Sequence, residues 1–135
     1  MSEALPAPLS RLLSQRLDAL SPQLARASLR PDALERFLVA SDFGYGVLLQ
    51  QADAIEKIAG PMPANPTLDP AAPAAWPAQL RRWRALASTR LIWRDVAGLD
   101  DVDATLAGAS AVADAAIATA LAAVEAQVAQ QHGVI

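Results

Sequence analysis

The segment from Trp76 to Gly98, WPAQLRRWRALASTRLIWRDVAG, decides the fold of this chain. It holds all three tryptophans and five of the eleven basic residues. Its apolar side chains recur every three or four positions, which is the spacing of one face of an α-helix. The segment therefore predicts one long helix, with an apolar stripe formed by Leu80, Trp83, Ala87 and Leu91 and widened by Leu86, Trp93 and Ala97.

A second helical pattern follows from Leu99 to Gly133 and contains no lysine or arginine. Asp100 or Asp101 suits the start of this helix, because a carboxylate there accepts a hydrogen bond from a free amide of the first turn. The short connection between the two long helices predicts that they pack antiparallel. Steps of three and four residues predict a core-facing seam on the second helix, made of Leu106, Ser110, Ala113, Ile117, Leu121, Val124 and Val128.

The first thirty residues predict shorter helices. Leucines at helical spacing predict one from Leu9 to Leu20, after a segment, Met1 to Pro8, that is expected to fray. Ser21 is expected to cap a short element that reaches about Ser28, with Pro22 in its first turn.

A better-defined helix is expected to begin at Pro31, with Leu34, Phe37 and Leu38 on its buried face. Ser41 and Asp42 are favoured N-cap residues, so a break is expected near Ala40; the alternative is one helix that runs through. Gly44 and Gly46 either weaken the helix or allow another helix to approach closely. The apolar pattern then continues to a C-cap at Gly60, through Val47, Leu48, Ile55 and Ile58.

Between the two halves lies a proline-rich connection, residues 61–75, whose five prolines exclude a continuous helix. Each half is too small to bury a core alone, so residues 1–135 are expected to form a single domain. The predicted fold is all-α, a bundle of five to seven helices with two long antiparallel helices at the C-terminal end.

Composition excludes several classes of site and partner. The chain has 135 residues, a net charge of −3, no cysteine and one histidine, so disulfides, thiolate metal sites and histidine clusters are excluded. The acidic balance argues against nucleic acid as the main partner. The N-terminus does not resemble a signal peptide, and no uncharged apolar run approaches the ~20 residues of a membrane span. We therefore expect no nucleic-acid partner, no membrane partner and a cytoplasmic location.

Basic residues of the first long helix are candidates for a contact site. Arg81, Arg82 and Arg84 lie near the helix start, where the helix dipole disfavours cations, so they are candidates for binding phosphate or an acidic partner. A solvated helix face is the simpler interpretation and is favoured. Arg90 falls on the apolar side and is expected to need an aromatic face or a carboxylate, supplied by Asp95, Asp100 or Asp42.

Other motifs favour structural roles. Asp101-Val102-Asp103 resembles a magnesium-binding pair, but no strand or Gly-Ser turn precedes it, so helix capping is favoured. Gly44-x-Gly46 lacks the full phosphate-binding pattern and the preceding strand. His132, near a helix end, does not support Ser-His-Asp catalysis. The tryptophans are expected in the core.

Three segments together resemble a known family: residues 38–51 (LVASDFGYGVLLQQ), 80–106 and 110–133. Their order is similar to that in the bacterial bifunctional glutamine synthetase adenylyltransferase/adenylyl-removing enzyme, in its N-terminal helical portion. The block Trp93-Arg94-Asp95 is the most specific part. The other matching residues are Ser41, Asp42, Phe43, Leu80, Arg81, Arg82, Arg84, Arg90, Gly98, Leu99, Ser110, Ala113 and Asp114.

The resemblance implies a role in the control of nitrogen assimilation. That family adds or removes AMP on a tyrosine of glutamine synthetase. It uses two nucleotidyltransferase domains in which a Gly-Ser turn and an Asp-x-Asp pair on a strand hold magnesium beside ATP or ADP. This sequence ends at Ile135, before any such motif, so the resemblance assigns no catalytic, cofactor-binding or metal-binding residue here. Arg90, Trp93, Arg94 and Asp95 are carried over as structural residues.

Two functions follow as hypotheses. The first is a non-catalytic helical part of that enzyme, with glutamine synthetase and the missing catalytic sheet of the same polypeptide as partners. The alternative is a free-standing helical interaction module without enzymatic activity. The first predicts an exposed apolar patch where the missing sheet would pack. A small enzyme in its own right lacks a convincing set of catalytic residues.

Overall fold

A computed structural model describes residues 5–133. Over this range the chain forms seven α-helices, one 3-10 turn and no strand, which confirms the predicted all-α fold. The elements are α1 (Ala7–Ala19), α2 (Ser21–Leu24), α3 (Pro31–Ala40), α4 (Asp42–Gln50), α5 (Ala54–Lys57), η1 (Pro73–Ala75), α6 (Trp76–Val96) and α7 (Val102–His132).

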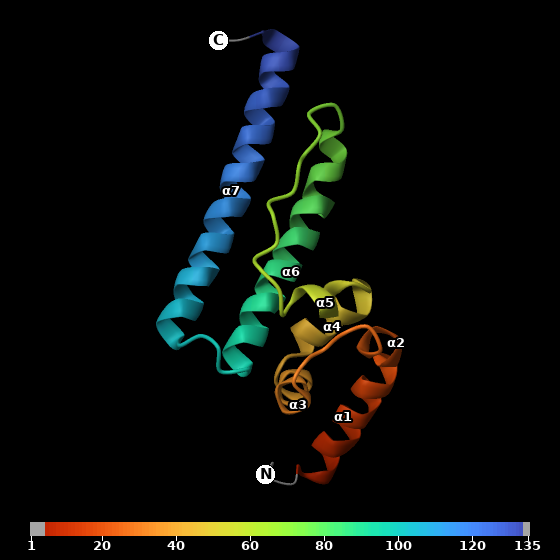
Figure 1. Cartoon of the computed structure of the whole chain (residues 1–135). Coiled ribbons are helices and arrows are strands. Elements are labelled where there is room, and N and C mark those ends of the chain that lie inside the picture. Colours follow the sequence, from red (N-terminus) through yellow and green to blue (C-terminus); the bar gives the residue numbers. More distant parts are fainter. Residues whose placement is uncertain (1–4, 134–135) are drawn as a thin grey trace.

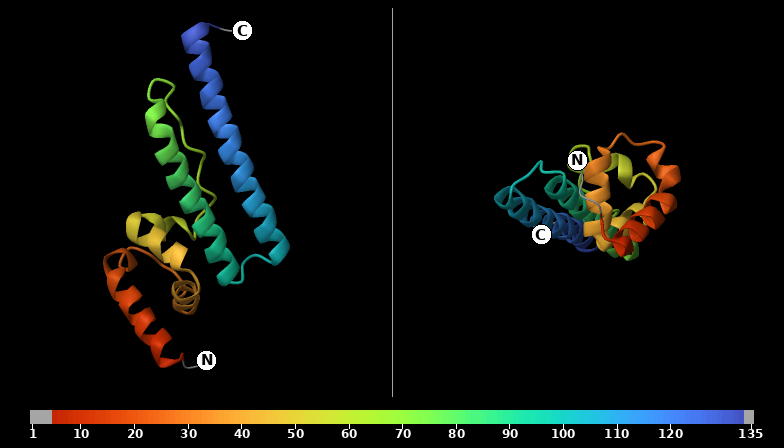
Figure 2. Two further views of the ribbon diagram at one scale, coloured as in Figure 1. Left: turned by 180° about the vertical axis from the view of Figure 1, so that it is seen from behind. Right: turned by 90° about the horizontal axis from the view of Figure 1, so that it is seen from below.

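Helix α6 lies at the centre of the molecule. It runs antiparallel to α7, as the short connection predicts, and on its other side it contacts α3 and α4 (Figure 1). Both views in Figure 2 show α6 between α7 and the cluster of front helices. Helix α6 therefore lies between two groups of elements, with the front helices on one side and α7 on the other.

The main core lies between the front helices and the C-terminal two-thirds of α6. Trp93 of α6 packs edge-on against Phe37 of α3, with ring centroids 5.9 Å apart. Aromatic pairs in this geometry add to the free energy gained by burying their surface. The side chains that are fully buried around them are Leu20, Leu38, Leu48, Ile55 and Ile58, so the apolar positions predicted along residues 34–58 are confirmed.

The expected break between α3 and α4 is confirmed, and Ser41 forms it. Its Oγ accepts a hydrogen bond from the amide of Gly44 at 2.9 Å, which satisfies a free donor of the first turn. Gly44 also allows the close approach that the sequence suggested, since a Cβ at this position would collide with the ring of Phe37. Gly46 has no such neighbour within 4 Å.

Helix boundaries differ from the expected ones in three places. Helix α1 begins at Ala7 rather than Leu9, because Pro8 is compatible with a first turn; residues 1–4 of the segment expected to fray lie outside the described residues. Ser21 is the first residue of α2 and makes no side-chain cap. Helix α4 ends at Gln50 instead of continuing to Gly60, because Gln51 adopts an extended backbone with φ −113° and ψ 99°.

The proline-rich connection is irregular from Pro61 until η1 and follows α6 along its length (Figure 1). Three α6 side chains hold it by donating to its backbone carbonyls. Arg90 Nε donates to Gly60 O at 2.8 Å, Trp83 Nε1 to Pro63 O at 3.4 Å, and Trp76 Nε1 to Asp69 O at 2.7 Å. These three hydrogen bonds hold the chain from Gly60 to Asp69 against α6.

The face of α7 that contacts α6 is not the predicted seam, and this part of the prediction is wrong. The helix turns its small residues toward α6, including Gly108, which faces Leu91 with no room for a Cβ. Val112 is 3% exposed and Ala123 7% exposed on this inner face. The larger residues of the expected seam point away from α6, and Leu106, Ile117, Leu121 and Val124 are exposed.

Candidate functional site

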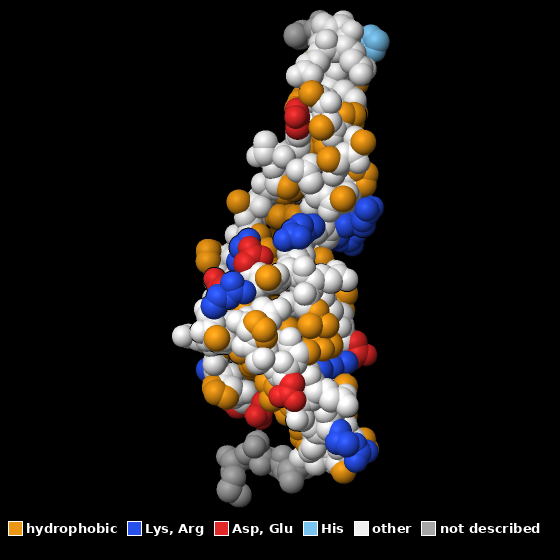
Figure 3. Space-filling view, turned by 90° about the vertical axis from the view of Figure 1, so that its right-hand side faces the viewer, with side chains coloured by type: hydrophobic (Ala, Val, Ile, Leu, Met, Phe, Trp, Pro, Cys, Tyr) orange, Lys and Arg blue, Asp and Glu red, His pale blue; other side chains and the backbone are white. Residues whose placement is uncertain are grey.

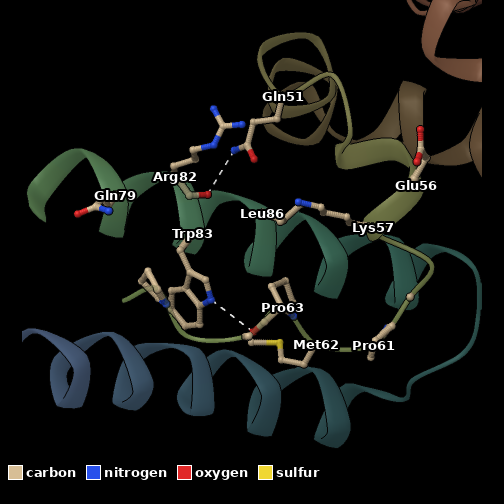
Figure 4. Close-up of a pocket in the computed structure, with 13 residues that line it drawn as sticks. Gln51, Glu56, Lys57, Pro61, Met62, Pro63, Gln79, Arg82, Trp83 and Leu86 are labelled. Atoms are coloured by element: carbon tan, nitrogen blue, oxygen red, sulfur yellow. Dashed lines mark hydrogen bonds between the residues drawn. The ribbon is translucent and has the colours of Figure 1, made fainter. Parts of the chain in front are cut away.

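A cavity lies where the proline-rich connection crosses α6 (Figure 4). Its volume is about 770 Å³. Its apolar part consists of Trp83 and Leu86 of α6 and of the connection residues Pro61, Met62, Pro63 and Pro66. The indole nitrogen of Trp83 donates a hydrogen bond to Pro63 O. This bond joins α6 to the proline-rich connection on the apolar side of the cavity.

The polar residues of the cavity come from three elements. Gln51 donates from Nε2 to the backbone oxygen of Arg82 at 3.2 Å (Figure 4). Lys57 forms an ion pair with Asp53 at 2.8 Å, and this hydrogen bond lowers the pKa of Asp53. Gln79 and Glu56 complete the polar set. Two cations, Lys57 and Arg82, line the cavity, but Lys57 is paired with Asp53 and Glu56 adds a carboxylate, so the charges of the lining largely offset one another.

The three predicted contact arginines are all exposed, but the structure does not bring them to one site. Arg82 lines the cavity, whereas Arg81 and Arg84 do not. Figure 3 shows basic side chains gathered over the middle of the face seen from the right of Figure 1, with hydrophobic side chains around them. A contact of Arg81, Arg82 and Arg84 with phosphate or a partner stays a prediction.

Arg90 has a different partner from those expected. No carboxylate pairs with it among the described residues; it donates to the Gly60 carbonyl instead. Desolvation lowers the pKa of its guanidinium, consistent with its half-buried position. The candidate carboxylates are placed elsewhere: Asp42 pairs with Arg16, Asp100 pairs with Arg94, and Asp95 is exposed.

Arg94, Asp100 and Asp101 build the turn between the two long helices. Arg94 forms a two-point ion pair with Asp100, with Nε to Oδ2 at 2.8 Å and Nη2 to Oδ1 at 3.0 Å. Its own carbonyl accepts from the amide of Leu99 at 2.8 Å. Asp101 then caps α7, accepting from the amide of Ala104 at 2.7 Å. The capping interpretation of Asp101-Val102-Asp103 is therefore confirmed.

Sequence reasoning missed Arg16, which lies in α1 and is 9% exposed. Its guanidinium donates to the Leu38 carbonyl, pairs with Asp42 and lies 4.5 Å from the centre of the Tyr45 ring. The residue locks α1 onto the α3–α4 break. Its position on the same helix face as Leu9, Leu13 and Leu20 was the available signal.

Metal binding and acid–base chemistry find no support in the described part of the chain. Over residues 5–133 no three acidic or histidine side chains converge to hold a metal ion. The aspartates with a lowered pKa, Asp32, Asp53 and Asp100, each accept a hydrogen bond from a nearby arginine or lysine. These shifts come from ordinary ion pairs and not from a catalytic pair.

The outer stripe of α7 is an exposed apolar feature that runs along the helix. We use this name for Val102, Leu106, Ile117, Leu121 and Val124, whose exposed fractions are 70%, 62%, 67%, 56% and 45%. The exposed patch predicted from the sequence is thus found on α7, although Trp83 and Trp93 are buried. By length and composition alone, α7 also meets the criteria for a helix that crosses a membrane.

Relatives with established names match nearly the whole chain. The bifunctional glutamine synthetase adenylyltransferase/adenylyl-removing enzyme of Stenotrophomonas maltophilia strain K279a is 49% identical over 138 residues, 97% of this chain and 15% of the relative. The enzyme of the same name from strain R551-3 is 47% identical with the same coverage. That of Xanthomonas campestris pv. campestris strain B100 is 51% identical over 110 residues, 76% of this chain and 12% of the relative.

This chain is homologous to part of that enzyme. The resemblance inferred from three short segments is therefore confirmed and extends over almost all residues. The chain spans about 15% of the length of the Stenotrophomonas relatives that it matches. No family model matches the sequence. No solved structure matches it either.

Proposed function

We propose that this chain serves as a non-catalytic helical part of a glutamine synthetase adenylyltransferase/adenylyl-removing enzyme. The proposal rests on the sequence match to the Stenotrophomonas maltophilia K279a enzyme. The two sequences are 49% identical over 97% of this chain, and the matched region is 15% of the relative. The name of these relatives states that such an enzyme acts on glutamine synthetase. In our proposal the chain works in the cytoplasm, and magnesium and ATP or ADP bind in other parts of the polypeptide.

The structure supports a scaffolding role for the described residues. Helix α6 is fixed on one side by the Trp93–Phe37 contact and on the other by α7. The Arg94–Asp100 ion pair and the Asp101 cap lie in the turn that joins the two long helices. A rigid pair of helices of this kind can position a neighbouring catalytic unit without contributing a reacting group.

The direct test is an activity assay of residues 1–135 with adenylylated glutamine synthetase, magnesium and phosphate. We expect no release of ADP, because the chain offers no converging metal ligands over its described part. The complete Stenotrophomonas maltophilia K279a enzyme is the positive control. Release of ADP by this chain alone would show that it is catalytic and would overturn the proposal.

A binding titration with the same substrate separates two forms of the role. Measurable binding without turnover assigns a docking function, for which the exposed Arg81 and Arg84 are the first residues to replace with glutamine. If the chain does not bind adenylylated glutamine synthetase, its role in the enzyme is purely structural.

The alternative, a free-standing interaction module, is compatible with the same exposed outer stripe of α7, which would then bind a separate protein. The gene discriminates between the two. A reading frame that continues past Ile135 into a Gly-Ser and Asp-x-Asp segment supports the enzyme part, whereas a stop codon there supports the module.

A further inference from the structure

Helix α7 has two apolar faces with different side-chain sizes. The inner face that packs on α6 uses small residues, and Val112 is its largest fully buried side chain. The outer stripe carries leucine, isoleucine and valine, which are 45–70% exposed and belong to none of the core clusters formed by residues 5–133. A helix that is apolar on both faces is typical of an element buried between two layers. Here only one of those layers is present.

Acidic residues border the outer stripe along one edge. Asp103, Asp114 and Glu125 recur every eleven residues and are all exposed. Because eleven residues make about three turns at 3.6 residues per turn, the three carboxylates form one row along the helix. No lysine or arginine lies anywhere in α7. The chemistry that complements this surface is an apolar face bordered by basic side chains.

This charge pattern disfavours two other occupants. Two copies of α7 packed antiparallel through the stripe would bring the acidic rows together, and a parallel pair would find no basic residue opposite them. A bilayer would have to take up Asp114, and an aspartate at the centre of a membrane helix costs about 2.5–3.5 kcal/mol. An anionic lipid surface would repel the acidic row.

We propose that the outer stripe of α7 docks against another region of the same enzyme polypeptide, one that presents an apolar surface bordered by lysine or arginine. The inference rests on the proposed function. Its second support is the length of the relatives, because most of their polypeptide lies outside the region that matches this chain and is available to form the missing layer. Helix α7 is then the wall shared by the α6 layer and that region.

Hydroxyl-radical footprinting with mass spectrometry tests this coverage at individual side chains. The two samples are residues 1–135 alone and the complete protein encoded by the reading frame that contains them. Proteolysis after Asp114 and Glu125 isolates a peptide with Ile117, Leu121 and Val124. We expect these residues to oxidise rapidly in the isolated chain and to fall to the rate of the fully buried Leu48 in the complete protein.

Equal, rapid oxidation in both samples would overturn the proposal. So would either of two results with the isolated chain: a dimer in solution that already protects the stripe, or protection on vesicles of phosphatidylethanolamine and phosphatidylglycerol. These outcomes differ from failure of the proposed function, which would appear as a stop codon after Ile135 or as activity of the chain alone.

The basic border is tested by charge reversal in the complete protein. Asp114→Lys should increase oxidation of the stripe, because the lysine would repel basic residues of the docked region, whereas Asp114→Asn should increase it less. Ala111→Lys is the matched control: Ala111 is exposed and lies about 120° from Ile117 around the helix at 100° per residue. Equal effects of Asp114→Lys and Ala111→Lys would show that the docked surface is not basic.

Discussion

Helices α6 and α7 are the two longest elements, yet only α6 is covered on both sides. Toward the front helices α6 buries Leu86 and Trp93, and toward α7 it buries Trp83 and Ala87. Helix α7 buries only Val112 and Ala123. The difference shows that a helix pattern rich in apolar residues does not by itself identify a helix that is buried in its own chain.

Side-chain size explains how the two helices meet. Small residues on the inner face of α7 allow its backbone to approach the larger α6 side chains closely, as Gly108 does with Leu91. Burial contributes about 25 cal/mol per Å² of apolar surface, so the large residues of the outer stripe leave a substantial stabilisation unused in this chain. The comparison predicts that substitutions of buried α6 residues destabilise the chain and substitutions on the outer stripe do not.

The largest effect is expected for Trp93→Ala. Trp93 is 3% exposed and packs against Phe37, so its truncation should lower the free energy of unfolding by about 3–5 kcal/mol. Leu121→Ala, on the outer stripe, should stay within about 0.5 kcal/mol. Urea denaturation followed by circular dichroism measures both. Similar losses for the two variants would mean that the stripe is covered in the isolated chain.

Val112→Asp and Ile117→Asp compare the two faces of α7 directly. At Val112 the carboxylate would be buried against α6, which should cost about 2–4 kcal/mol through lost apolar burial and desolvation. At Ile117 it would stand in water, and the cost should stay below about 1 kcal/mol in thermal or urea unfolding of the isolated chain. A larger loss at Ile117 would reverse the assignment of the faces.

Local sequence signals predicted most of the helices. The long helices, the break before α4 and the cap at Asp101 were predicted, because helical period and capping chemistry depend on neighbours within a few residues. The face that α7 turns toward α6 was not predicted. Periodicity marks where apolar residues align, but α7 carries two apolar faces, and choosing between them requires the shape of α6.

The candidate site was less predictable for the same reason. The positions of Arg81, Arg82 and Arg84 on one helix were clear, but only the folded connection shows that Arg82 alone lines the cavity. Arg90 was expected to find a carboxylate or an aromatic face, yet its partner is a carbonyl thirty residues earlier. Such a contact depends on the path of an irregular segment that has no periodic signal.

Arg90→Met tests how far α6 depends on that contact. The methionine keeps most of the apolar stem but removes the donor to Gly60 O, so the free energy of unfolding should fall by about 1–2 kcal/mol. Arg84→Met, at an exposed position of the same helix, should change it by no more than about 0.5 kcal/mol. Hydrogen exchange should also show faster exchange of the Gly60 amide, which is bonded to Lys57 O, in the Arg90 variant only.

The smallest expected effect concerns pH and the turn that joins the two long helices. The hydrogen bonds from Arg94 lower the pKa of Asp100 below its usual 3.8. The folded state therefore binds this proton less readily than the unfolded state, and the ion pair contributes stability above pH 3.8 that is lost as the pH falls through the lowered pKa. Thermal melts of the isolated chain between pH 2 and 7 should show a higher Tm for the parent than for Arg94→Gln near neutrality, and the two curves should converge at the acidic end.

Arg84→Gln, on the exposed face of α6, should follow the parent throughout. A constant gap between parent and Arg94→Gln across the range would show that the guanidinium stabilises the turn through its packing and not through the charge of Asp100.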